Sequence, residues 1–547
     1  MPGRAGRVRS SSAARDAGDR SKPRAMTAAD TTDVAGRRQA GRGAIASHVA
    51  WNAAGRGLPL LLALALTPVL VALMGIERWG LFTLALAMVG VFGVFDLGVG
   101  QALTRTIAER IGAGRGEEAP GLVGAALACL VGISVAVAAL AWACIPFLVE
   151  RLLRIPPALQ AEAVAAMRVL VVAAPLVVVN AALWGVLAAY QRFRAMNLVT
   201  MPVSAFYYLG PVLTLLVWDS LVGVMLALVA CRLAMTIAYA VMMRRALPAG
   251  APLFRGLRLA RVVPLLKLGG WMTFAGLLTQ ALTYADRFLI GALISLTAVA
   301  FYATPLDLVM RAWILPVAVA QALLPAMAGA FATRAAETAD LLRRGALAIA
   351  ALVLPACLVL AGAAWMLLRL WLGAEFADGG AAVLRILAVG VFFSCAAFAP
   401  AALLDAMGRP DATARFALAQ ALVFLPLTAL VLWLGGGIAG AAAVWALRCT
   451  VDCAGKLAIV ARLYPAAAPA ARGLAAPLAG GGAGVLAVAL AGSIGAGWPV
   501  ILALGLAGGG LGLALVLRAL SAAERRDLFH LLRHPRAALR PAAAGSS

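Results

Sequence analysis

The chain has 547 residues, of which 64% are hydrophobic and only 13% are charged, with a mean hydropathy of +0.96. A soluble core cannot hide that much apolar surface, so the composition excludes a soluble protein and indicates a membrane protein. The net charge of +23 would suggest nucleic acid in a soluble chain, but the basic residues here lie between apolar runs, which favours anionic lipid as the partner. Seven cysteines without a CxxC pair indicate neither a disulfide framework nor a zinc site.

Fourteen apolar stretches follow one another along the chain, each long enough for a helix that crosses a bilayer. They begin near residues 46, 78, 120, 164, 197, 221, 264, 297, 343, 381, 412, 437, 473 and 498. The breaks between them, such as Trp218-Asp219-Ser220, are too short to hold a soluble domain. The sequence therefore predicts an all-α polytopic membrane protein with about 14 transmembrane helices.

Three basic segments lie outside these stretches. Residues 1–42 are rich in Arg, Gly, Ser and Ala, which predicts a disordered cytoplasmic tail. Residues 244–263 interleave arginines with apolar side chains, a pattern that suits a linker lying in the cytoplasmic interface on anionic headgroups. Residues 519–547 form a second cytoplasmic tail after helices 13 and 14, which are predicted at 473–518.

The distribution of basic residues predicts the orientation. Most of the 46 Lys and Arg residues fall in the two tails and the even-numbered connections, and only four fall in the connections on the other side: Arg78, Arg151, Arg154 and Arg369. By the positive-inside rule, the first group faces the cytoplasm, so both termini are predicted to be cytoplasmic.

Alignment of the chain with itself indicates an internal duplication. At an offset of 216, Gly75 meets Gly291 and Arg232 meets Arg448; at 217, Arg192 meets Arg409. Such matches on several helices predict an N-terminal half at 43–243 and a C-terminal half at 264–463. Because each half has an even number of spans, we expect parallel repeats related by an axis along the membrane normal, with a cleft between them.

Several short motifs resemble those of bacterial oligosaccharide flippases, members of the multidrug/oligosaccharidyl-lipid/polysaccharide exporter superfamily. The motifs, in chain order, are Trp79-Gly80-Leu81-Phe82, Phe95-Asp96-Leu97-Gly98-Val99-Gly100, Asp286-Arg287-Phe288-Leu289-Ile290-Gly291, Phe301-Tyr302-Ala303-Thr304-Pro305, Trp371-Leu372-Gly373 and Asp405-Ala406-Met407-Gly408-Arg409-Pro410. Each motif alone is weak, but their order is specific, and the resemblance covers residues 45–460. The basic tail before residue 43 departs from the family pattern.

The resemblance implies a function in polysaccharide biosynthesis. It implies a non-enzymatic flippase that moves polyprenyl-diphosphate-linked oligosaccharide from the inner to the outer leaflet of the bacterial cytoplasmic membrane by alternating access. The implied partners are this lipid, anionic membrane lipids, and a polysaccharide polymerase with glycosyltransferases, and no nucleic acid. No Walker loop is present, so no nucleotide or other cofactor is expected. Three alternatives stay open: a cation-coupled multidrug exporter, a membrane glycosyltransferase or ligase, and a nontransporting scaffold.

Arginines within the helices are the candidates for binding the diphosphate, because guanidinium gives a fixed charge and bidentate donors. The cavity candidates are Arg56, Arg287, Arg311 and Arg448. For each one there is an alternative role that involves no substrate, in which the side chain snorkels to the interface or neutralises a neighbouring acid.

Acidic residues beside these arginines are the candidates for ion or proton coupling, namely Asp286, Asp307 and Asp452. Asp286 and Arg287 are adjacent and project about 100° apart, so at least one must find another partner. Asp307 and Arg311 are four residues apart, which predicts an ion pair along one helix face. Arg448, Asp452 and Lys456 form a stripe that should face the interior of its half, and no metal site is predicted.

Overall fold

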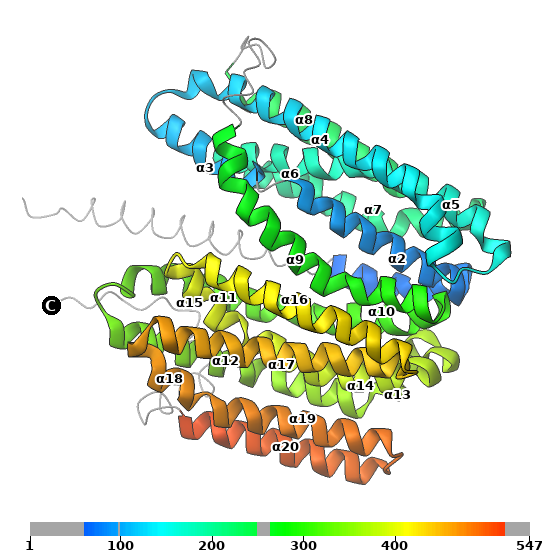
Figure 1. The fold of residues 1–547 in the computed structure, drawn as a ribbon, viewed down its shortest axis with the longest axis vertical. Helices are drawn as coiled ribbons and strands as arrows, with labels where there is room; N and C mark the ends of the chain where they lie inside the picture. The colour runs from blue at the N-terminus through cyan, green and yellow to red at the C-terminus, as the bar shows by residue number, and fades with distance from the viewer. Residues whose placement is uncertain (1–58, 97–98, 249–262, 520–547) are drawn as a thin grey trace, which may run out of the picture. The chain divides into compact units, whose positions relative to one another are not determined.

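The computed structural model describes residues 59–96, 99–248 and 263–519, and this part of the chain is helical with no strand (Figure 1). All of the described residues belong to one compact unit, Leu58–Ser547. Arg56, the tail 1–42 and most of the linker and of the C-terminal tail lie outside the described residues, so the predictions made for them stay predictions.

In the N-terminal half, an apolar helix at Pro59–Met74 precedes the labelled elements. These are α2 (Ile76–Phe92), η1 (Gly93–Asp96), α3 (Val99–Gly112), α4 (Ala119–Phe147), α5 (Pro157–Val171), α6 (Ala173–Ala189), α7 (Phe193–Val217) and α8 (Leu221–Ala246).

The C-terminal half and the two added helices are likewise built from apolar helices. They comprise α9 (Val263–Leu293), α10 (Leu296–Met310), η5 (Arg311–Trp313), α11 (Ile314–Ala330), α12 (Ala335–Gly362), α13 (Ala364–Leu372), α14 (Ala374–Ala396), α15 (Phe398–Ala406), α16 (Pro410–Trp433), α17 (Gly437–Leu463), α18 (Ala468–Gly473), α19 (Ala475–Ser493) and α20 (Trp498–Ala519).

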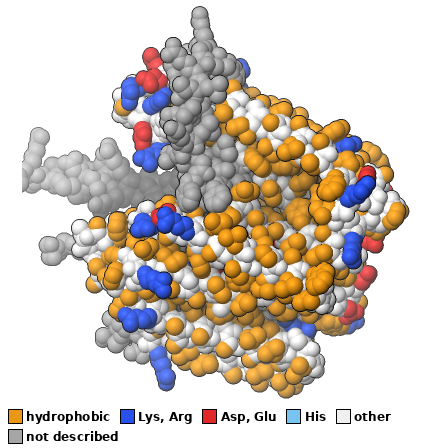
Figure 2. Space-filling view, viewed as in Figure 1, with side chains coloured by type: hydrophobic (Ala, Val, Ile, Leu, Met, Phe, Trp, Pro, Cys, Tyr) orange, Lys and Arg blue, Asp and Glu red, His pale blue; other side chains and the backbone are white. Residues whose placement is uncertain are grey.

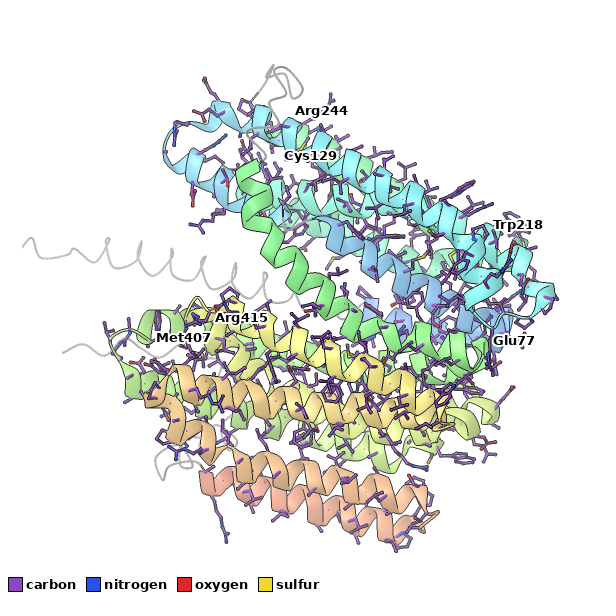
Figure 3. All side chains as sticks on the ribbon, in the orientation of Figure 1. Glu77, Cys129, Trp218, Arg244, Met407 and Arg415 are labelled. Atoms are coloured by element: carbon purple, nitrogen blue, oxygen red, sulfur yellow. The ribbon has the colours of Figure 1, made fainter. Side chains whose placement is uncertain are left out.

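The polytopic all-α prediction is confirmed. Ten of the described helical segments are long and apolar enough to cross a membrane, and Pro59–Met74 is a shorter apolar helix; the count of 14 crossings stays a prediction. Figure 2 shows a hydrophobic belt between two ends where charged side chains gather. Figure 3 places Glu77 and Trp218 at one end and Arg244 and Arg415 at the other, which separates the predicted outer residues from the predicted cytoplasmic ones.

The two halves fold on matching plans. In the N-terminal half α3 packs on α6, α4 on α5 and α7 on α8, and in the C-terminal half α11 packs on α15, α12 on α14 and α16 on α17. A short 3₁₀ turn, η1 or η5, interrupts the corresponding helix in each half. Arg192 and Arg409, which the 217-residue offset aligns, immediately precede α7 and α16. The domain boundaries themselves stay predictions.

The halves meet where α2 packs against α10. A Cβ atom at Gly80 would lie 2.1 Å from the carbonyl oxygen of Leu296, so only glycine allows this approach. Positions 80 and 296 differ by 216, the offset of the duplication. Equivalent positions therefore touch, as expected if a pseudo-two-fold axis passes between α2 and α10.

Candidate functional site

A cavity of about 70 Å³ lies between the two halves, and we call it the central cavity. Its walls come from Pro59–Met74, α2 and α7 of the N-terminal half and from α10, η5 and α13 of the C-terminal half. The lining combines hydroxyl, charged and aromatic side chains: Thr67, Thr83, Thr304, Asp307, Arg311, Trp79, Phe82, Tyr207, Tyr208 and Trp371. Apolar walls that carry a few converging polar groups are typical of small-ligand sites.

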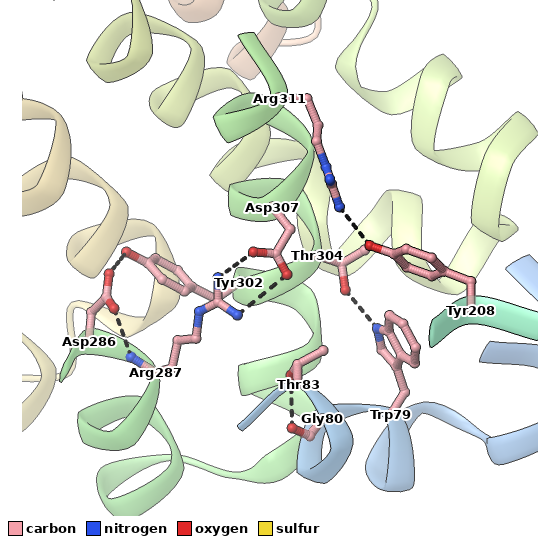
Figure 4. Close-up of polar contacts among 10 residues, drawn as sticks. All are labelled: Trp79, Gly80, Thr83, Tyr208, Asp286, Arg287, Tyr302, Thr304, Asp307 and Arg311. Carbon is pink, nitrogen blue, oxygen red and sulfur yellow. Dashed lines mark hydrogen bonds and ion pairs between the residues drawn. The ribbon is translucent and has the colours of Figure 1, made fainter. Parts of the chain in front are cut away.

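Asp307 is the acidic group among the described residues that line the central cavity, and its partner differs from the predicted one. The Asp307 carboxylate accepts hydrogen bonds from Arg287 on α9, at 2.5 Å from Nη2 and 3.4 Å from Nη1 (Figure 4). The Asp307 side chain is 46% exposed, whereas that of Arg287 is 4% exposed. Arg287 thus lies behind the cavity wall and holds the carboxylate that faces the cavity.

Arg311 does not pair with Asp307, so the four-residue spacing gave the wrong partner. The helix tightens from α10 into the 3₁₀ turn η5 at Arg311, and the guanidinium turns away from Asp307 (Figure 4). Its Nη2 donates to the hydroxyl of Tyr208 on α7 at 3.1 Å, a contact between the two halves. Arg311 therefore lines the central cavity with donors that no described carboxylate occupies.

Asp286 lies away from the central cavity. Its carboxylate accepts hydrogen bonds from the Tyr302 hydroxyl and from the backbone N–H of Arg287 at 2.9 Å, and the residue is 7% exposed. It lines a second, smaller pocket inside the C-terminal half with Thr428 and Arg448. The expectation that at least one of Asp286 and Arg287 finds another partner is confirmed.

Arg448, Asp452 and Lys456 lie on α17. Lys456 Nζ is 2.7 Å from Asp452, and Gln420 on α16 donates to the same carboxylate at 2.8 Å. The Arg448 guanidinium lies over the Trp445 ring, 5.9 Å from its centroid. The described contacts of this stripe are therefore within the C-terminal half, away from the central cavity.

Two tryptophans join the halves beside the central cavity. Trp79 Nε1 on α2 donates to Thr304 Oγ1 on α10 at 2.8 Å, and Trp371 Nε1 on α13 donates to the carbonyl oxygen of Leu64 at 2.7 Å. Each half thus donates one indole N–H to the other. The sequence analysis included both tryptophans and Thr304 only as members of family motifs, and it missed Tyr208, since nothing in the local sequence marks that residue as part of a cavity.

The sequence of the chain matches a protein family and a protein from Shigella flexneri. A profile of the family described as "Polysaccharide biosynthesis protein" matches residues 45–331. A Shigella flexneri protein described as "Putative O-antigen transporter" is 24% identical over 409 residues, which cover 75% of this chain and 96% of that protein.

Two solved structures share the fold. One is an inward-facing multidrug resistance MATE family transporter of the MOP superfamily, with a TM-score of 0.66, 15% identity, and coverage of 75% of this chain and 96% of that one. The other is the lipid II flippase MurJ in an inward closed conformation, with a TM-score of 0.67, 13% identity, and coverage of 88% and 100%.

The sequence motifs, the repeated helix packing and the family match agree with one another. At these low identities the solved structures show the fold, while the family match covers more than half of the chain. The chain is a multi-pass membrane protein that belongs to the polysaccharide biosynthesis protein family, as its motifs predicted.

Proposed function

We propose that this protein is a flippase for polyprenyl-diphosphate-linked oligosaccharide, which it moves from the inner to the outer leaflet of the cytoplasmic membrane by alternating access. The observation that carries the proposal is the central cavity, in which Arg311 faces hydroxyl and aromatic side chains from both halves. The Shigella relative, named as an O-antigen transporter, supports the substrate class.

The chemistry of the lining suits such a headgroup. A diphosphate cannot enter hydrocarbon unaided, and a guanidinium in a low-dielectric site offers it charge and paired donors. Thr67, Thr304 and Tyr208 add hydroxyl groups for sugars. Arg56, Arg287 and Arg448 remain candidates, with Arg287 acting through Asp307 and Arg448 from the neighbouring pocket.

The membrane potential can contribute to the driving force. Outward movement of negative charge is favoured by an inside-negative potential, by about 2.3 kcal/mol per charge and 100 mV. Asp307, Asp286 and Asp452 stay candidates for ion or proton coupling, and Asp307 is the one that faces the central cavity.

The first test is deletion of the gene. The polyprenyl-linked intermediate should then accumulate in the inner leaflet and the outer-face polymer should disappear, because no other route carries the headgroup across. Normal polymer in the deletion strain would contradict the proposal.

The second test asks whether Arg311 binds the anion. Arg311→Gln should abolish polymer export while membrane levels stay near normal, and Arg311→Lys should keep part of it because the charge remains. Arg415→Gln is the matched control, since Arg415 is 74% exposed and lies outside the cavity lining. Wild-type export by Arg311→Gln would remove Arg311 from the site.

A cation-coupled multidrug exporter is the second candidate. Its support is the fold shared with the MATE transporter and the presence of the Asp307 carboxylate among aromatic residues. Competition separates the two: for a flippase, farnesyl diphosphate should protect the purified protein against heat and tetraphenylphosphonium should not. The reverse result would favour the exporter.

A further inference from the structure

We propose that Trp79 and Thr304 form an outer gate whose hydrogen bond is replaced by a hydroxyl of the bound headgroup, which makes Thr304 a specificity-determining residue for a polyhydroxylated substrate. The gate itself follows from the geometry alone. Its link to a sugar-bearing lipid rests on the function proposed above.

Two separate hollows lie between the halves, one behind the other. The outer hollow, of about 610 Å³, is lined by Gly75, Glu77, Thr297, Leu372 and Glu375 among others, at the end predicted to face outside. The central cavity is lined by residues further along the same elements. On α2, Glu77 lines the outer hollow and Trp79 lines the central cavity. On α13, Leu372 lines the outer hollow and Trp371 lines the central cavity.

The two tryptophans therefore lie at the boundary between the hollows. Trp79 is 6% exposed and stacks on Phe82 with ring centroids 5.3 Å apart, so its ring is packed in place. One residue before it, Arg78 pairs with Glu162 at 3.1 Å and with Asp219 at 2.9 Å, which anchors this end of α2 to its own half. A headgroup that leaves the central cavity toward the outer hollow has to separate α2 from α10 and break the Trp79–Thr304 bond.

The acceptor of that bond faces the substrate site. Thr304 is 3% exposed, lines the central cavity, and lies one helical turn before Asp307 (Figure 4). Opening the gate without a replacement would leave the buried indole N–H of Trp79 unpaired, which is costly. A sugar hydroxyl both donates and accepts, so it can bond to Trp79 and Thr304 at once. An apolar or purely cationic ligand cannot do this, and the gate would stay closed over it.

The first experiment measures the gate without any ligand. Leu86 lines the central cavity, so a Leu86→Cys variant reports opening when intact cells are treated with a membrane-impermeant maleimide. Cys144, which is exposed near the predicted outer end, is replaced by Ser in the background. Thr304→Val keeps the side-chain shape but removes the acceptor, so the labelling rate should rise about three- to ten-fold, the loss of one hydrogen bond.

Thr83→Val is the matched control. Thr83 is also buried and also lines the central cavity, but its hydroxyl donates to Gly80 within α2 and makes no bond between the halves. Its labelling should match the parent. Trp79→Phe should raise labelling as Thr304→Val does, and the double variant should add nothing further. Equal labelling of Thr304→Val and Thr83→Val, or additive effects in the double variant, would overturn the gate.

The second experiment tests the hydroxyl in proteoliposomes. The probe is the lipid-linked oligosaccharide fraction from a strain without its polysaccharide polymerase, and its control is the same fraction after mild acid has removed the sugars. The intact fraction should raise labelling of the parent protein about three- to ten-fold, and the stripped fraction should not. Neither fraction should raise it further in Thr304→Val. Equal stimulation by both fractions, or by neither, would overturn the role of the hydroxyl.

The two experiments fail separately. Because the Thr304→Val measurement uses no lipid substrate, a failure of the flippase proposal in the deletion strain leaves that measurement unaffected. A flippase confirmed by deletion with unchanged labelling in Thr304→Val would overturn only the gate.

Discussion

The central cavity and the interior of the C-terminal half both hold charged side chains within apolar helices, but these charges have different partners. In the C-terminal half, Asp286 is held by Tyr302 and by a backbone N–H, and Asp452 by Lys456 and Gln420. In the central cavity, the hydroxyl of Tyr208 is the one hydrogen-bond partner of Arg311 among the described residues. Charges that satisfy one another stabilise a helix bundle, whereas a charge that the protein leaves without a counter-ion is available to a ligand.

The largest expected effect is a difference in stability between variants of Arg287 and variants of Arg311. Arg287→Met should lower the free energy of unfolding by about 3 kcal/mol, because the Asp307 carboxylate loses its two charge-assisted hydrogen bonds. Arg311→Met should lower it by about 1 kcal/mol, since only one hydrogen bond, to the uncharged hydroxyl of Tyr208, is lost. Thermal unfolding in detergent measures both, and a larger loss in Arg311→Met would invert the comparison.

A smaller effect is expected at the contact between the halves. Gly80→Ala should destabilise the protein by about 1–3 kcal/mol, because its Cβ would meet the backbone of Leu296 and force α2 from α10. Gly132→Ala on α4 is the control, as no atom lies within 4 Å of the added Cβ. Equal melting temperatures for the two variants would argue against a tight contact at Gly80.

The smallest effect is expected in the charged stripe of α17. Lys456→Met should cost about 1 kcal/mol of stability, because Gln420 still donates to Asp452. Polymer export should stay at the wild-type level, since neither residue lines the central cavity. A loss of export at unchanged membrane levels would place the stripe in the transport pathway and end the contrast between the two regions.

The sequence predicted the fold because the lengths of the apolar stretches and the repeat offset can be read from the chain without knowing how its helices pack. The 217-residue offset of Arg192 and Arg409 identifies two equivalent helix starts that the structure shows. It also selected Arg287, Asp307 and Arg311, because charges are rare within apolar stretches. It could not assign their partners, since the 3₁₀ turn at η5 changes the direction of Arg311, and it could not select Tyr208, whose role depends on how two halves pack.

The contact of position 80 with position 296 has a consequence for the fused chain. In a dimer of two identical six-helix proteins, one residue type would occupy both sides of that contact, and any change would be imposed twice. A single polypeptide is free of this constraint, and here a glycine faces a leucine. Joining the repeats thus lets the molecule keep a symmetric scaffold while the residues along its axis become different, so that each half can contribute its own side chains to the central cavity.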